Sequence, residues 1–74
     1  MKLSVPNEAK EIKNKLVSII QKDQDEFIKS ALTDLIICIN AVEQLDSRRH
    51  LEILLPQAIQ KAVRAIDTYK TKVQ

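Results

Sequence analysis

The chain has 74 residues, a formal net charge of +2, one cysteine, one histidine and no glycine. The missing glycine excludes phosphate-binding loops and dinucleotide fingerprints, because both need glycine where the backbone approaches phosphate. One cysteine and one histidine cannot build the usual structural zinc site, and a single cysteine cannot form a disulfide within the chain. We therefore expect a single non-enzymatic domain over residues 1–74, with no cofactor, no metal ion and no catalytic residue.

Hydropathy and cysteine content indicate in which cellular compartment the protein is expected. The longest uninterrupted apolar run covers residues 35–39, far fewer than the roughly 20 residues that cross a bilayer. The first residues carry a lysine but no apolar stretch of the kind that a secretory signal needs. A lone cysteine suits a reducing environment. We expect a cytoplasmic protein that makes no use of a membrane.

A first helix is predicted from about Pro6 to Lys22. Proline is well placed in a first turn, where its missing N–H is not needed. Apolar residues then recur at intervals of three and four, as on one face of a helix. This face consists of Ala9, Ile12, Leu16 and Ile19, and Ile20 widens it.

The second predicted helix runs to about Leu45 and is the most apolar of the three. Asp23 and Glu26 have the spacing of a capping box, so the sequence predicts that Asp23 caps this helix. A turn is expected at residues 46–47, where the apolar periodicity loses its register. The buried seam alternates steps of three and four, as in a coiled coil: Ile28, Ala31, Leu35, Cys38, Val42 and Leu45.

Downstream of the turn, one apolar face continues from Leu51 to Val73 but contains Pro56. Proline removes a helical hydrogen bond and disfavours helical geometry at the residue before it. The sequence allows either a short helix that meets a longer one at Pro56 or one helix kinked there, and the unbroken face favours the kink. The predicted fold is all-α, an antiparallel three-helix bundle completed by oligomerisation.

Charge is distributed unevenly along the chain. Residues 23–46 contain six acids and one base, a local charge of −5, whereas the two flanking segments together carry +7. Neighbouring helices show this pattern when the charges along their boundaries are complementary. We expect much of the basic charge to be balanced within the molecule.

The centre of the second helix is apolar all round, which is typical of a buried helix. Ile36 and Ile37 lie off the predicted seam, and two neighbouring helices cannot cover every side. Two further apolar residues lie off the main face of the third helix. We expect another chain, either a second copy or a different protein, to cover an interface made of Ile36, Ile37, Ile39, Ile53 and Val63.

Three lone features have both a structural and a functional interpretation. Arg48, Arg49 and His50 form a small basic cluster at a helix start, where an anion would also meet free backbone N–H groups, although a solvated turn is the simpler interpretation. His50 could act as a base oriented by Asp46, but a first-turn histidine beside a cap is expected. Cys38 lies in the apolar seam, where a thiol behaves as a small hydrophobe.

Two classes of function fit these observations. The first is a small protein-interaction module that associates with itself or with a partner through the second helix. The alternative is a dimeric nucleic-acid-binding regulator, which would use bases of the first and third helices to neutralise phosphates. Its candidate contacts are Lys10, Lys13, Lys61 and Arg64, with the Arg48–His50 cluster. Both aromatic residues are expected to face the core, which leaves no stacking platform for bases.

Overall fold

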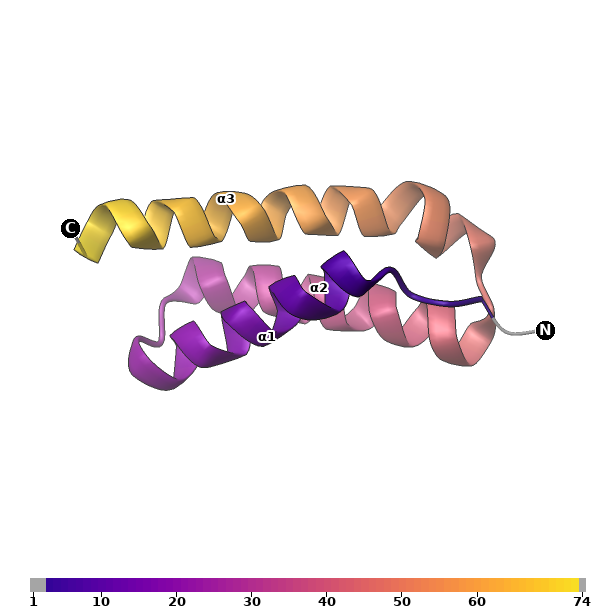
Figure 1. Ribbon diagram of the computed structural model, residues 1–74, viewed down its shortest axis with the longest axis horizontal. Coiled ribbons are helices and arrows are strands. Elements are labelled where there is room, and N and C mark those ends of the chain that lie inside the picture. The colour runs from indigo at the N-terminus through magenta and orange to yellow at the C-terminus, as the bar shows by residue number, and fades with distance from the viewer. Residues whose placement is uncertain (1–2, 74) are drawn as a thin grey trace.

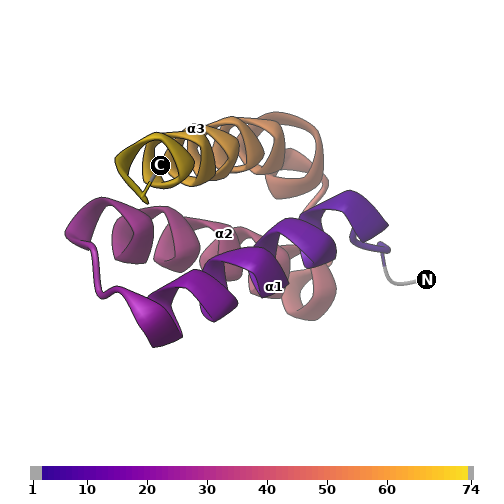
Figure 2. The same ribbon diagram turned by 60° about the vertical axis from the view of Figure 1, so that its left-hand side comes forward.

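The computed structural model describes residues 3–73, and within that range the chain is helical apart from its first residues and two turns. The elements are α1 (Asn7–Lys22), α2 (Glu26–Leu45), a π-helical turn η1 (His50–Leu54) and α3 (Leu55–Val73). In Figure 1 the chain doubles back after α1 and again after α2, so the three helices lie side by side (Figures 1 and 2). The molecule measures 44 × 19 × 19 Å. The prediction of an all-helical chain with three helices is confirmed.

Helix α1 has the boundaries that its sequence predicts. Pro6 precedes it, and the Pro6 carbonyl accepts the Ala9 N–H at 3.1 Å. Ala9, Ile12 and Leu16 are buried, and the two isoleucines that follow are half-buried against the core. The periodicity of three and four therefore identified the buried face of α1 correctly.

Asp25 caps α2, and the prediction of Asp23 as the cap is wrong. One Asp25 carboxylate oxygen accepts the Phe27 N–H at 2.8 Å and the Ile28 N–H at 3.3 Å. These are two of the helix-start donors that have no partner within the helix. Asp23 instead ends α1, because its N–H donates to the Ile19 carbonyl at 2.8 Å.

The seam of α2 is buried from Ile28 to Val42, but Leu45 is 74% exposed. Its assignment to the core is wrong for a geometric reason. A repeat of 3.5 residues drifts around a straight helix of 3.6 residues per turn, so the last member of the seam no longer points at the neighbouring helices. The helix also ends there, since Asp46 adopts a left-handed conformation with φ of 54°.

The chain remains helical from residue 48 to residue 73 and is not split at Pro56. Residues His50–Leu54 form a π-helical turn, in which the Leu55 N–H donates to the His50 carbonyl five residues earlier. Pro56 lacks an N–H, and in a regular α-helix its ring would crowd the carbonyl of Glu52. The wider π-turn directly before the proline accommodates both effects.

All three helices contribute to one hydrophobic core. Leu16, Leu35, Val42 and Leu55 are its largest fully buried side chains. Val5, in the extended segment before α1, is also buried, and Leu3 is partly buried against the core. The Leu3 N–H donates to the Asp46 carboxylate, which joins this segment to the turn after α2.

We predict that Leu35→Ala lowers the free energy of unfolding by about 2–5 kcal/mol, because it removes a fully buried side chain and leaves a cavity. Ile37→Ala, on the neighbouring exposed position, should change it by about 0.5 kcal/mol or less in the monomer. Urea denaturation followed by far-UV circular dichroism, at a concentration low enough to keep the protein monomeric, measures both. Equal losses for the two variants would show that Ile37 belongs to the core.

Candidate functional site

Three large apolar side chains are exposed along the outer side of α2. Phe27 is 42% exposed, Ile37 57% and Leu45 74%. At 100° per residue, Phe27 and Leu45 are five full turns apart and point in the same direction, while Ile37 lies about 80° from them. The α2 stripe is here defined as these three side chains together with the exposed Ser30 and Asp34, which lie between Phe27 and Ile37.

The α2 stripe borders a groove between α2 and α3. One hollow in this groove, with a volume of about 370 Å³, has buried Cys38 and Ala58 in its wall and exposed Ile37 at its edge. A second hollow of about 360 Å³ adjoins the first, since Gln57 and Lys61 line both, and it extends to Phe27. The first hollow is lined by Asp34, Ile37, Cys38, Leu54, Gln57, Ala58 and Lys61.

The charges at the centre of this groove are paired across it. The Lys61 ammonium lies 2.8 Å from a carboxylate oxygen of Asp34 and also donates to the Ser30 hydroxyl at 3.1 Å. Another chain could therefore cover the Asp34–Lys61 pair without leaving either of these two charges unpaired, which is the main cost of burying ionised groups.

Cys38 lies in the wall of the groove and is suited to packing rather than reaction. Burial raises the pKa of its thiol, and the Asp34 carboxylate raises it further. A raised pKa keeps the thiol protonated over a wider pH range, whereas nucleophilic attack needs the thiolate. The expectation that Cys38 acts as a small hydrophobe agrees with its burial.

The structure does not bring the five predicted interface residues together on one surface. Ile37 borders the groove between α2 and α3, whereas Ile36 is half-buried and lies two turns from Glu43 on the α1 side of α2. Val63 lines a different hollow, between α1 and α3. Ile53 is exposed on η1.

Ile39 has to be removed from the predicted interface. It is only 5% exposed and belongs to the core of the monomer. It follows Cys38 on the inner side of α2, so the buried face of the helix is wider than the predicted seam. A partner that covers the outer surface of α2 cannot reach Ile39.

Sequence reasoning missed Phe27 and Leu45, which were both assigned to the core. No periodic pattern separates Leu45 from the seam that it continues. Phe27 directly precedes Ile28, the first residue of that seam, and a displacement of one residue rotates a side chain by 100°, from the core to the shoulder of the helix. Tyr69, by contrast, packs against the core as expected.

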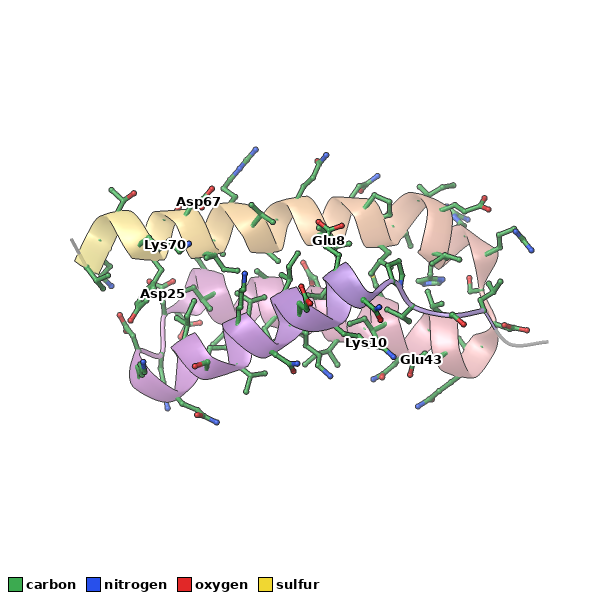
Figure 3. All side chains as sticks on the ribbon, viewed as in Figure 1. Glu8, Lys10, Asp25, Glu43, Asp67 and Lys70 are labelled. Carbon is green, nitrogen blue, oxygen red and sulfur yellow. The ribbon has the colours of Figure 1, made fainter. Side chains whose placement is uncertain are left out.

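Among the described residues, three bases of the flanking segments form ion pairs with the acidic middle of the chain, which agrees in part with the expectation that the basic charge is balanced within the molecule. Lys10 of α1 lies 3.5 Å from Glu43 of α2, on the edge of the bundle away from α3 (Figure 3). Lys61 pairs with Asp34, as described above. The remaining pairs join Lys72 of α3 to Asp23 at 3.5 Å and to Asp25 at 3.7 Å.

These ion pairs also separate the bases proposed to contact nucleic acid. Glu43 and Asp34 are nine positions apart on α2, which is a rotation of 180°. Their partners Lys10 and Lys61 therefore lie on opposite flanks of the bundle. Lys13 is half-buried and Arg64 is exposed at the end of the α2–α3 groove.

The Arg48–His50 cluster forms a helix start. The Ser47 hydroxyl accepts the His50 N–H at 3.4 Å and lies 2.6 Å from Nδ1 of the His50 ring. Arg48 pairs with Glu52 one turn later at 3.3 Å. The Asp46 carboxylate accepts the Leu3 N–H, and Ser47, not Asp46, is the partner of the imidazole.

Comparison of the chain with protein-family models, curated proteins and solved structures gave no match in any of the three. Among residues 3–73, no group of three or more His, Cys, Asp or Glu side chains could hold a metal ion. None of the helices in the same range combines the length and hydropathy needed to cross a membrane.

We predict that Cys38 reacts with iodoacetamide at pH 8 at least about tenfold more slowly in the native protein than in denaturant, because the buried thiol reacts only when the structure opens. The raised thiol pKa acts in the same direction, since it lowers the thiolate fraction at any given pH. Mass spectrometry of timed samples measures the rate. A native rate equal to the denatured rate would mean that the thiol is accessible.

We predict only generic weak binding to DNA or RNA at about 150 mM salt, with a dissociation constant no better than about 10⁻⁶ M. The reason is that Lys10 and Lys61 lie on opposite flanks and are paired with acids. Fluorescence anisotropy over a range of salt concentrations tests this. Submicromolar binding that is lost in a variant without Lys10, Lys13, Lys61 and Arg64 would contradict it.

Proposed function

We propose that this chain is a small non-enzymatic protein-interaction module of the cytoplasm, an antiparallel three-helix bundle that associates with a second copy of itself through the α2 stripe and the adjoining α2–α3 groove. The observation that carries the proposal is the exposure of Ile37 beside that groove, together with the exposure of Phe27 and Leu45 on the same helix. Covering these side chains removes apolar surface from water, which favours association.

The size of the molecule supports a second copy as the occupant. Its accessible surface is 5145 Å², whereas a compact monomer of this mass has about 4,700 Å². The long, narrow shape therefore leaves more surface exposed than a compact monomer of this mass has. Chains of this length commonly gain stability by oligomerisation.

The dimensions of the face also fit an interface between two copies. The long side of the molecule, 44 by 19 Å, has a projected area of about 800 Å², which is about what each partner buries in a stable interface. The paired charges of Asp34 and Lys61 add no unpaired charge to that surface. A single symmetric contact would thus cover the exposed apolar side chains of α2.

The alternative, a dimeric nucleic-acid-binding regulator, has less support. Lys10 and Lys61 are engaged by acids of α2 on opposite flanks, so they cannot track one phosphate backbone together. Of the two aromatic side chains, Tyr69 packs on the core, whereas Phe27 is exposed in the hollow that Lys61 and Arg64 also line.

We predict that Ile37→Asp raises the dissociation constant of the dimer by at least about 30-fold, which is the effect of losing a central interface residue. Ser18→Asp is the control, because it adds the same charge to an exposed helical position on α1, away from the α2–α3 groove. Sedimentation equilibrium over a range of concentrations measures the constant, and circular dichroism verifies that both variants stay helical.

Two outcomes would overturn the proposal. The first is a wild-type protein that stays monomeric at every concentration up to the millimolar range. The second is a dimer that Ile37→Asp and Ser18→Asp weaken equally, since the interface would then lie elsewhere.

A further inference from the structure

An extended segment, residues 3–5, covers the end of the bundle that α1 does not reach, and is here called the strap. Helix α1 has 16 residues and α2 has 20, so at 1.5 Å per residue α1 is about 6 Å shorter than its neighbour. The turn η1 packs against α2 and α3 rather than against α1. The strap runs on from the start of α1 toward the turn after α2 (Figure 1).

The sequence makes the strap extended. A residue that precedes proline is held away from helical geometry, so α1 cannot continue backward from Pro6 through Val5. Three extended residues span about 10 Å, which is more than the length by which α1 falls short. Their side chains alternate as in a strand: Val5 is only 6% exposed and Leu3 is partly buried against the core, whereas Ser4 between them is exposed.

One hydrogen bond fastens the strap in addition to this burial. The Leu3 N–H donates to the Asp46 carboxylate, and within residues 3–73 no other backbone group of the strap has a hydrogen-bond partner. Asp46 also ends α2 in a left-handed conformation with φ of 54°, which aspartate tolerates better than most residues. The residue that terminates α2 therefore also holds the strap.

We propose that the strap is a cover that opens and closes over the end of the core while the three helices stay packed, with the Asp46 carboxylate as its latch. Opening breaks a single hydrogen bond and exposes two apolar side chains, and it returns conformational freedom to three residues. Segments with so few contacts open at a much lower free energy than a helical core. The open form uncovers the apolar surface on which Val5 packs.

The strap is independent of the proposed self-association. No residue of the strap lines either hollow of the α2–α3 groove. The alternative to a moving cover is that the strap is a fixed part of the core, since Val5 belongs to the same hydrophobic cluster as Val42. In that case Val5 becomes accessible only when the whole bundle unfolds.

Thiol labelling distinguishes a moving strap from a fixed one. Val5→Cys and Val42→Cys are matched substitutions at buried valines, 6% and 0% exposed, each made in a chain that also carries Cys38→Ala. The iodoacetamide rate of each native chain is divided by the rate of the same chain in denaturant. We expect this ratio to be at least about tenfold larger at position 5 than at position 42, because the strap opens without the core.

Asp46→Gly, added to both chains, tests the latch. Glycine adopts the left-handed conformation at residue 46 readily but has no carboxylate, so α2 should end as before while the strap loses its hydrogen bond. We expect the ratio at position 5 to rise at least about tenfold, the effect of losing a hydrogen bond to a charged acceptor. At position 42 it should change less than about threefold.

Two labelling results would overturn the proposal. Equal ratios at positions 5 and 42 would show that the strap opens only with the whole bundle, and an unchanged ratio at position 5 in Asp46→Gly would show that the carboxylate is not the latch. Hydrogen exchange of the Leu3 and Val42 amides in the wild-type chain gives the same comparison without a substitution. A Leu3 amide, corrected for its intrinsic rate, that exchanged as slowly as the Val42 amide would likewise contradict a moving strap.

Discussion

The structure depends on α2, which has to pack against two neighbours at once. Its inner face supplies Leu35 and Val42 to the centre of the core, and the width of that face explains why Ile39 and Ala41 are buried in addition to the predicted seam. A helix that serves two neighbours needs an apolar arc wider than one row. The short turns then place α1 and α3 on the two sides of α2, and the rest of the fold follows from this position of α2.

The ion pairs on the two sides of α2 act on alignment more than on stability. Glu43 receives Lys10 of α1, and Asp34 receives Lys61 of α3 on the opposite side. All four side chains are substantially exposed, so each pair contributes about 0–1 kcal/mol. Their more important effect is on register. If α1 or α3 were displaced along α2, its lysine would lose the carboxylate with which it pairs, or its own acidic side chains would lie against acids of α2.

The third helix shows how a local conflict in the sequence is absorbed. Pro56 cannot donate a hydrogen bond, yet the apolar face on both sides of it must reach the same core, since Leu51 and Ala58 both pack there. If the helix broke at Pro56, the segments before and after the proline could rotate independently, and their apolar faces would no longer be aligned. The π-turn at residues 50–54 accommodates the proline while the chain stays helical, so the face remains continuous from η1 to α3.

The sequence by itself determined the three helices, most of the buried face of each and the charge complementarity between the middle of the chain and its ends. These properties follow from periodicity and from residue type, which act over a few turns of helix. The tertiary structure alone decided that Asp25 and not Asp23 caps α2, and that the backbone passes Pro56 through a π-turn. It also decided that Ile39 is buried while Phe27 and Leu45 are exposed. Each of these depends on where a side chain points relative to two neighbouring helices, and a rotation of 60–100° about the helix axis, which no local pattern specifies, changes the outcome.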